Sequence, residues 1–559
     1  MRAMIISLLV SCLAVISFAE VTPVVINGPL ALRDIQLDRG IQPSPSADRY
    51  LDDWLNYRIN SDHSGQVQNE QQIVVNPTNP DNVVAVWRDF RLGYRRVGLG
   101  RSFDGGYTWD DELFVVPDYE KQSDPGLTWH SSGTIYTVVL SFNDSNPSDA
   151  LQVASSEDGG ITWSDWHTAV SNTTPDLFED KELMACDRSG GLYDGNVYVA
   201  WARFGNQTNI MCVRSTDGGV NWDDPVSVGN DTGVQWPVPA IGPDGELYIG
   251  WVKYYDNQIR FNRSFDGGVT FGHEDIIVQP TAFASASINP QLLIFAFPAM
   301  DVDITNGPHR GQIYIAYTDQ WYGDTDIFFT TSTDSGSTWS TPTRINDDLP
   351  GNGADQFHPW LVCDENGVLH LIFYDRRIDL PQNLFMDLYY TTSTDAGLSW
   401  SANERITTVS SNPGLDSLDS GLIGEYNGLA VMNNVIHPVW TDTREGQQDT
   451  YTAVIDTTVS VPQLQEDPLS GRPHGFRIEA SPNPFNGEVR FSFELRKSTQ
   501  ARVAIYNLHG REVALIADSF MREGIRGYSW KPGYASSGLY FITVQSDVEM
   551  DLKKVLYLK

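Results

Sequence analysis

One short phrase, an Asp followed by small residues and by an aromatic residue five places after the Asp, occurs six times in the chain. The copies are SFDGGYTW (102–109), SEDGGITW (156–163), STDGGVNW (215–222), SFDGGVTF (264–271), STDSGSTW (332–339) and STDAGLSW (393–400). Catalytic motifs seldom repeat in this way, whereas structural units do. Most of the chain must therefore be built from copies of one unit.

A β-strand precedes each phrase, and a seventh strand of the same kind has no phrase after it. The strands are VVAVWRD (83–89), IYTVVLSF (135–142), VYVAWARF (197–204), LYIGWVKY (247–254), IYIAYTD (313–319), LHLIFYD (369–375) and VIHPVWTD (435–442). Their spacing of roughly 50 to 65 residues suits one four-stranded antiparallel sheet per repeat in a radial array. The pattern predicts an all-β propeller, with seven blades favoured and six possible if one repeat is split or absorbed.

The phrase resembles the Asp-box, or BNR repeat, of the sialidase superfamily, and the resemblance covers most of residues 68–457. In such a unit we expect the phrase between the third and fourth strands. The Asp would accept hydrogen bonds from the turn, the glycines would allow positive φ, and the aromatic residue would pack into the blade. Because Asp-box propellers include glycosidases, binding proteins and assembly factors, the resemblance implies the fold more strongly than an activity.

Both ends of the chain have a different character. Residues 1–19 have the pattern of a secretory signal, with Arg2 before an apolar run, and residues 20–67 are predicted to be an N-terminal extension. A lipoprotein signal ending at Cys12 is the alternative. No later segment has about 18 uninterrupted apolar residues, so no membrane span is expected after the signal is removed. The three remaining cysteines, an odd number, argue against a disulfide framework.

A linker (458–476) leads to a tail (477–559) of short alternating strands, which predicts a small Ig-like β-sandwich. The segments SPNPFN, YNLHGREV, SGLYFITV and KKVLYLK resemble the C-terminal sorting domain of type IX secretion cargo, which is related to an Ig-like module of flagellar hook-capping proteins. The resemblance implies a partner, the type IX secretion machinery, and export across the outer membrane to the cell surface or the medium. An ordinary Ig-like adaptor is the alternative.

The formal net charge of -35 excludes nucleic acid as an expected partner, because binding it needs a basic surface. The chain has no phosphate-binding loop and no dinucleotide fingerprint. His358 and His437 lack a spacing typical of zinc ligands, and the acidic loop at 346–356 lacks the alternation of an EF-hand. The sequence thus predicts no cofactor and no metal.

Charged residues gather where the second strands end, on the face opposite the repeated turns, and a ligand is expected to bind there. The candidate catalytic residues are Asp89, Glu182, Asp375, Glu425, Tyr426 and Asp442. The candidate substrate-binding residues are Arg88, Arg91, Arg203, Arg377 and Arg444. The starts of the first strands add Glu70, Asp124, the Asp180-Lys181-Glu182 cluster, Asp355 and His358 to this predicted ring of charges.

Two functions fit this ring. In the first, arginines hold an anionic sugar while two carboxyl groups about 5–10 Å apart hydrolyse a glycosidic bond of an extracellular glycan or glycoprotein. In the second, the carboxylates are buried against arginines and the propeller binds glycan or protein without catalysis.

The comparison with sialidases weakens the first hypothesis. Sialidases carry an Arg-Ile-Pro segment near the start of the first blade, whereas this chain reads EQQIVVNP (70–77). Glu425 and Tyr426 have the residue types of the sialidase nucleophile pair. Since they are adjacent, both reach one substrate only if the backbone there is irregular.

Overall fold

The structure is a computed structural model that describes residues 55–457 and 478–558, apart from 144–147, 175, 273, 416–420, 482–484, 496, 508–511, 533–537 and 547–549. The predicted signal segment, most of the predicted extension and the whole predicted linker lie outside the described residues. The chain divides into two compact units, Met1–Val459 and Ser460–Lys559. Among the described residues, no helix has the length and hydropathy needed to span a bilayer.

The first unit repeats one element, an antiparallel sheet whose strands follow each other in chain order. The first sheet contains β2 (Gln68–Val75), β3 (Val83–Asp89), β4 (Arg96–Ser102) and β5 (Asp110–Leu113). The second contains β6 (Lys121–Trp129), β7 (Ile135–Phe142), β8 (Asp149–Ser156) and β9 (His167–Asn172). The third contains β10 (Phe178–Cys186), β11 (Val197–Phe204), β12 (Asn209–Ser215) and β13 (Val226–Ser227). The fourth contains β14 (Val234–Ile241), β15 (Leu247–Lys253), β16 (Gln258–Ser264) and β17 (Ile276–Pro280).

The same element continues after an inserted hairpin, β18 (Ser285–Ile288) and β19 (Leu292–Phe295). The fifth sheet contains β20 (Ala299–Val302), β21 (Ile313–Asp319), β22 (Asp326–Ser332) and β23 (Thr343–Arg344). The sixth contains β24 (Gln356–Cys363), β25 (Leu369–Asp375), β26 (Asp387–Ser393) and β27 (Glu404–Arg405), with a 3-10 turn at Arg377–Asp379. A second 3-10 turn, Pro413–Leu415, precedes the seventh sheet, which contains β28 (Gly428–Met432), β29 (Val435–Asp442), β30 (Asp449–Ala453) and β31 (Ile455–Asp456).

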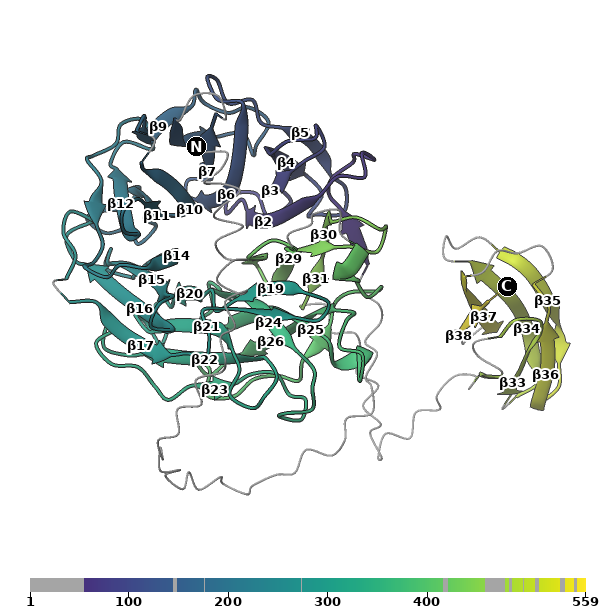
Figure 1. Ribbon diagram of the computed structural model, residues 1–559. Coiled ribbons are helices and arrows are strands. Elements are labelled where there is room, and N and C mark those ends of the chain that lie inside the picture. Colours follow the sequence, from purple (N-terminus) through teal and green to yellow (C-terminus); the bar gives the residue numbers. More distant parts are fainter. Residues whose placement is uncertain are drawn as a thin grey trace, which may run out of the picture. The chain divides into compact units, whose positions relative to one another are not determined.

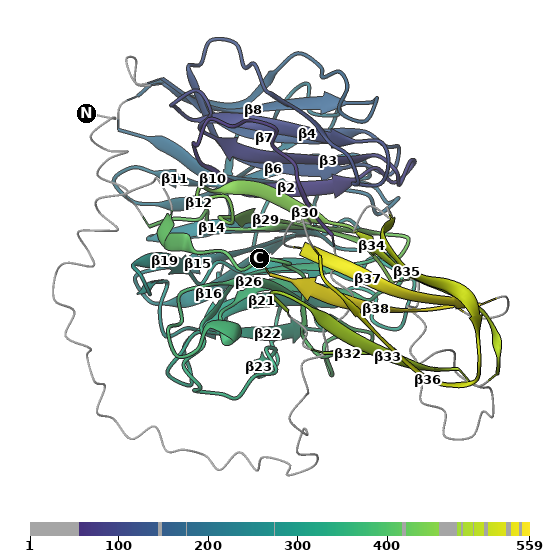
Figure 2. The ribbon, with the colours of Figure 1, turned by 90° about the vertical axis from the view of Figure 1, so that its right-hand side faces the viewer.

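The first strands of successive sheets contact each other around a closed ring, from β2 through β6, β10, β14, β20, β24 and β28 back to β2. Figure 1 shows the sheets following one another around this ring, from purple β2–β5 to green β29–β31. In Figure 2, which turns the view by 90°, β2 and β6 of neighbouring sheets lie side by side. The predicted all-β propeller is confirmed, and the described residues form seven such sheets.

The ring closes with a strand from before the first repeat. β1 (Asn56–Arg58) pairs antiparallel with β30 and completes the seventh sheet on its outer side. This segment belongs to the region predicted to be an extension outside the propeller. It supplies the outer strand that the seventh unit lacks because its own sequence has no Asp-box and no strand after one. The segment that precedes the first repeat is thereby held in the sheet of the last repeat.

Each Asp-box forms a turn held by its own side chains. In the fifth, Ser332 Oγ donates to Asp334 Oδ1 (2.8 Å), and Thr338 donates from its backbone N–H to Oδ1 (2.8 Å) and from its hydroxyl to Oδ2 (2.6 Å). Desolvation acts to raise the pKa of Asp334, but these hydrogen bonds together outweigh it and lower the pKa to about 2. The Asp is exposed at the turn and acts as a brace for the backbone, as the sequence predicted.

The box also joins neighbouring sheets. Gly336, at φ 82°, lies so close to Phe261 of the preceding sheet that an added Cβ would be 2.2 Å from the ring. The ring of Trp339 packs edge-on against the same Phe261 at 5.4 Å. The first box makes the equivalent approach to the seventh sheet, where a Cβ on Gly106 would be 3.2 Å from His437. The repeated phrase therefore fixes both the turn and the contact between sheets.

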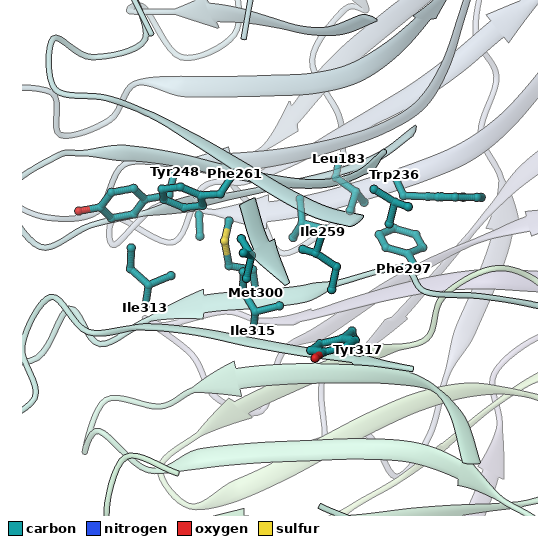
Figure 3. Close-up of a cluster of buried hydrophobic side chains, with 14 of the residues drawn as sticks. Leu183, Trp236, Tyr248, Ile259, Phe261, Phe297, Met300, Ile313, Ile315 and Tyr317 are labelled. Atoms are coloured by element: carbon teal, nitrogen blue, oxygen red, sulfur yellow. The ribbon is translucent and has the colours of Figure 1, made fainter. Parts of the chain in front are cut away.

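A large apolar cluster fills the space between the fourth and fifth sheets. Figure 3 shows Trp236 and Phe297 next to Leu183, and Met300 next to Ile315. Along β21 the members of the cluster, Ile313, Ile315 and Tyr317, alternate, as expected for a strand packed between two layers. The cluster extends to Tyr426 and so borders the centre of the ring.

The second unit is a sandwich of two antiparallel sheets. One contains β32 (Glu479–Ser481), β33 (Val489–Leu495) and β36 (Gly524–Trp530), and the other contains β35 (Glu512–Met521), β34 (Thr499–Asn507), β37 (Gly538–Ser546) and β38 (Met550–Tyr557). Alternate residues such as Phe491 and Phe493 of one sheet and Ile542 and Val544 of the other form its core. The predicted Ig-like sandwich is confirmed.

Candidate functional site

Three predicted catalytic aspartates, Asp89, Asp375 and Asp442, end second strands and pair with the arginine two positions later. Arg91 donates to Asp89 from its guanidinium (2.7 Å) and from its backbone N–H (2.8 Å). The same two hydrogen bonds occur within the other two pairs, at 2.7 Å and 2.7 Å for Asp375 and at 2.7 Å and 2.9 Å for Asp442. All three aspartates are fully buried. Each pair therefore braces a turn between the second and third strands.

The arginines of these turns have further partners. The guanidinium of Arg377 stacks over Tyr389 at 4.7 Å, and that of Arg444 stacks over Tyr451 at 4.5 Å. Arg203 pairs with Glu179 at 2.8 Å and lies over Trp201. These predicted substrate-binding residues thus use much of their hydrogen-bonding capacity within the fold.

The first strands carry a common irregularity near their beginning. The register shifts within five of them, and a residue with positive φ lies at each shift: Glu70, Asp124, Lys181, Trp236 and His358. An irregularity of this kind re-aims side chains that would otherwise alternate along the strand. Polar residues of different sheets consequently meet at the centre of the ring.

We call the resulting group, Glu70, Arg88, Asp124, Lys181 and Glu425, the central charged cluster. Lys181 Nζ lies 3.1 Å from Glu425 Oε2, 3.5 Å from Asp124 Oδ1 and 3.6 Å from Glu70 Oε1. Arg88 Nη1 lies 3.0 Å from Glu70 Oε1 and 4.0 Å from Asp124 Oδ1. The carboxyl groups of three sheets therefore share two cations, and the exposure of Glu70, Asp124 and Glu425 is 0%, 3% and 6%.

Glu425 and Tyr426 both reach the centre because the backbone before β28 is irregular. Gly424, at φ 87°, lies against the backbone of Glu70, where an added Cβ would be 2.8 Å from its nitrogen. Glu425 Oε2 accepts a hydrogen bond from Trp236 Nε1 (2.7 Å), and the Tyr426 hydroxyl donates to the carbonyl of Pro125 (3.2 Å). The irregular backbone that two adjacent residues need in order to reach one place is therefore present.

Burial and nearby charges drive the pKa values of two neighbouring carboxyl groups of the cluster, Glu70 and Asp124, in opposite directions. Burial raises the pKa of Glu70 from its usual 4.5 to about 8, against the opposing effect of Arg88 and Lys181. Burial also acts to raise the pKa of Asp124, but Lys181 and Arg88 outweigh it and hold that pKa below its usual value. At neutral pH one carboxyl group is therefore protonated and its neighbour ionised.

Burial also favours the neutral form of two further groups at the centre. Burial, and then the charge of Asp124, raises the pKa of Glu182 well above its usual value. Burial, and then the charges of Glu70 and Asp124, raises the pKa of Tyr426. Both shifts disfavour the ionised form that a nucleophile would need.

An aromatic layer lies beside the cluster and includes the inserted hairpin. Phe295 of β19 packs against Trp236 at 5.0 Å and stacks on His358 at 6.2 Å. Phe297, just after β19, contacts Tyr426 at 5.8 Å. Burial lowers the pKa of His358 to about 3, so its ring is neutral. The insertion thus packs against the same elements that hold the charges and helps to exclude water from them.

Of the predicted site residues, the structure brings Glu182, Glu425, Tyr426 and Arg88 to the centre. It places Asp89, Asp375, Asp442, Arg91, Arg203, Arg377 and Arg444 in braced pairs at or near the ends of the second strands. Lys181 and Trp236 hold Glu425; Lys181 was predicted as a member of the charged ring but not as a catalytic or substrate-binding residue, and Trp236 was not predicted at all. Their signal in the sequence is weak, because it consists only of a polar or bulky residue early in a first strand.

The seven first strands surround a central channel. The charged cluster lies at one end of it, and a cavity of about 330 Å³ lies at the other end, on the side of the Asp-box turns. The later halves of all seven first strands line it, with Trp129, Leu183, Met300 and Trp360 among the walls. Arg188, from the turn after β10, also lines it. Trp360 packs against Tyr426 at 6.1 Å, so the cavity borders the aromatic layer.

Residues 480–557 match the family described as the secretion system C-terminal sorting domain. The C-terminal unit is a sorting domain. This confirms the predicted tail, and the protein is cargo of the type IX secretion machinery, exported to the cell surface or beyond.

The propeller is similar in structure to several solved enzymes, all remotely. A Hadza microbial sialidase, Hz136, matches with a TM-score of 0.40 and 14% identity over 70% of this chain, which spans 66% of that sialidase. The α-L-arabinanase of Penicillium chrysogenum matches with a TM-score of 0.41 and 13% identity over 72% of this chain and 97% of the enzyme. An ulvan lyase of polysaccharide lyase family 25 matches with a TM-score of 0.44 and 10% identity over 70% and 95%.

Proposed function

We propose that this exported propeller binds extracellular glycans on the face formed by the turns between second and third strands, without hydrolysing them. The observation that carries the proposal is the state of the central carboxyl groups. Glu70, Asp124 and Glu425 are buried, and Lys181 lies within 4 Å of all three. A glycosidase instead needs two carboxyl groups that face a sugar in an accessible pocket.

Exposed aromatic side chains on the same face support a glycan as the ligand. They are Tyr94, Tyr255, Trp321, Tyr322 and Phe385, all in turns between second and third strands. The ring of Trp321 packs on Phe328 at 5.0 Å and its Nε1 donates to Asp319, so the ring is held in place while nearly half of the residue remains exposed. A fixed, exposed aromatic ring presents an apolar surface to the C–H face of a sugar at small entropic cost.

Glycan-array binding of the exported chain tests the proposal, with Tyr255→Ala and Trp321→Ala as the variants. Phe265→Ala is the matched control, because Phe265 is equally exposed but lies in an Asp-box turn on the opposite face. We expect the first two variants to lose glycan binding and the control to keep it. Binding that is unchanged in both variants contradicts the proposal.

A glycoside hydrolase is the second candidate, favoured by one observation. Glu70 and Asp124 are neighbouring carboxyl groups whose pKa values are driven in opposite directions, as in an acid and base pair. Hydrolysis at this site requires the buried carboxyl groups to become accessible to a sugar. Turnover of fluorogenic glycosides, sialosides included, that is abolished by Glu70→Gln would favour this candidate.

A further inference from the structure

The cavity at the Asp-box end of the channel is walled by the free edges of the first strands. Each first strand is the terminal strand of its sheet and pairs only with the second strand. In an antiparallel pair, every other residue directs its backbone N–H and C=O away from the partner strand. On the free edge of a first strand these peptide groups have no partner in the ladder, so they face the channel.

The hydrogen bonds at the turns between first and second strands show which residues these are. In the second sheet, the His130 N–H donates to the Thr134 carbonyl at 2.9 Å. Counting back along β6, Thr128 then pairs in the ladder, and the N–H and C=O of Leu127 point toward the channel. The same count in five other sheets gives one equivalent residue in each, and all of them line the cavity: Ile73, Met184, Pro239, Met300 and Leu361.

Pro239 supports this assignment, because a proline has no N–H and fits a strand only where the ladder does not need one. Nearer the Asp-box turns, side chains of neighbouring first strands bind the channel-facing N–H groups. Thr128 Oγ1 accepts the N–H of Cys186 at 3.2 Å, and Asp301 accepts the N–H of Cys363 at 2.8 Å. The fold thus satisfies the outer layer of these peptide groups with its own side chains.

The next layer inward has no such partners. No residue that the structure describes forms a hydrogen bond with the channel-facing peptide groups of Leu127, Met184 and Leu361. A buried peptide group without a hydrogen bond is costly. The cavity therefore suits an occupant that offers donors and acceptors on all sides.

A sugar ring has this property. The cavity volume of about 330 Å³ lies within the range of small-molecule pockets. A pyranose with equatorial hydroxyls carries its donors and acceptors around its rim and its C–H groups on its two faces, where apolar side chains such as that of Trp360 can contact them. A neutral hydroxyl also suits the charged groups of the lining, because it can accept from Arg188 and donate to the carboxylates of Asp301, Asp364 and Glu365.

We propose that this cavity binds a neutral polyol of the size of a monosaccharide, whose hydroxyls form hydrogen bonds with the channel-facing peptide groups of the first strands. The site lies at the end of the channel opposite the proposed glycan-binding face and does not depend on it.

Hydrogen–deuterium exchange of the folded, exported chain tests this site, with methyl β-D-glucopyranoside, whose ring substituents are all equatorial, as the probe. We expect the probe to slow exchange in the first strands, at Leu127, Met184 and Leu361 among others, with a saturable dependence on its concentration. The second strands should change much less, because their amides are paired on both sides in the sheet. Tetrahydropyran-2-methanol has the same ring without the ring hydroxyls and should give no protection.

Ser131→Trp tests the entrance, because Ser131 is exposed and lines the cavity. The added ring should narrow the entrance and weaken binding about tenfold or more, a loss of at least 1.4 kcal/mol. Thr333→Trp is the matched control. Thr333 is exposed in an Asp-box turn outside the cavity, and two other boxes have a phenylalanine at the same place, Phe103 and Phe265. This variant should bind the probe as the unchanged chain does.

The absence of saturable slowing in the first strands overturns the proposal, and so does equal protection by the tetrahydropyran or equal binding by the Ser131→Trp variant. Slowing that is confined to the turns between second and third strands also overturns it and supports the glycan-binding face instead. If the Ser131→Trp variant fails to fold, the exchange pattern of the unchanged chain with the two probes still decides the question.

Discussion

The two ends of the channel are lined by the same seven first strands but differ in what those strands carry. At one end, register shifts bring Glu70, Asp124 and Lys181 together in a buried, paired cluster. At the other end the strands are regular and leave a cavity lined by apolar side chains, by Arg188 and by the carboxylates of Asp301, Asp364 and Glu365. The difference shows that irregular strands can fill the centre of the ring with charged side chains, whereas regular strands leave a cavity there.

Removal of Lys181, the cation shared by the buried carboxyl groups, should have the largest effect on stability. Lys181→Met leaves Arg88 as the cation beside Glu70 and Asp124 and leaves Glu425 with the hydrogen bond from Trp236. Loss of one member of a buried ion pair costs about 3–5 kcal/mol. We expect a large fall in the free energy of urea unfolding. A change of less than about 1 kcal/mol would show that the charged end is hydrated and open.

Loss of a box aromatic should destabilise the fold by somewhat less and leave the charged end intact. Trp339→Ala removes a partly buried ring that packs on Phe261. Full burial would give about 3–5 kcal/mol, so we expect about 3 kcal/mol. An unchanged melting temperature would contradict the role of the box as a joint between sheets.

The pH dependence of stability should report the buried acid of the cluster. The pKa of Glu70 is raised in the fold to about 8, so between its usual pKa of 4.5 and about 8 the folded state binds more protons than the unfolded state. The stability contributed by this group is therefore complete below about pH 4.5 and is lost as the pH rises toward 8. The charged and titratable groups that face this carboxyl group are Lys181, Arg88, Asp124 and Tyr426. They are unchanged in the Glu70→Gln variant described next.

Glu70→Gln should accordingly flatten the fall in unfolding free energy between pH 5 and 8. Denaturant unfolding at several pH values measures this. An identical slope for the two proteins would mean that Glu70 is ionised and solvated in the fold.

The smallest effect is expected at a braced turn. Arg444→Ala removes the guanidinium from Asp442, but the backbone N–H of residue 444 and Trp440 Nε1 still donate to that carboxylate. We expect a loss of about 1–2 kcal/mol and unchanged glycan binding. Loss of glycan binding in a stably folded Arg444→Ala variant would show that Arg444 contacts the ligand.

The repeats allowed most of the fold to be predicted, because each Asp-box carries its own turn chemistry and each second strand its own apolar pattern. The sequence could not show that residues 56–58 close the ring, since three residues carry no pattern and their pairing with β30 joins distant parts of the chain. The sequence also does not show which charged residues at the strand ends contact each other. They were predicted to form one ring, whereas the structure places some in braced turns and others at the buried centre.

The central residues depended on backbone irregularity. Strict alternation would direct Glu425 and Tyr426 to opposite sides, and only the positive φ of Gly424 and the close approach to Glu70 allow both to reach one place. Positive φ at non-glycine residues such as Lys181 has no reliable signature in a single sequence. The Glu425–Lys181 contact was therefore beyond prediction, although both residues were named as members of the charged ring.

The most direct test of the closed, non-catalytic charged end is turnover of a fluorogenic glycoside panel by the folded exported chain and by its Glu425→Gln and Glu70→Gln variants. The account predicts no turnover by any of the three, together with glycan binding by the unchanged chain. Turnover by the unchanged chain that disappears in the Glu425→Gln or Glu70→Gln variant would contradict it and identify the centre of the ring as an active site.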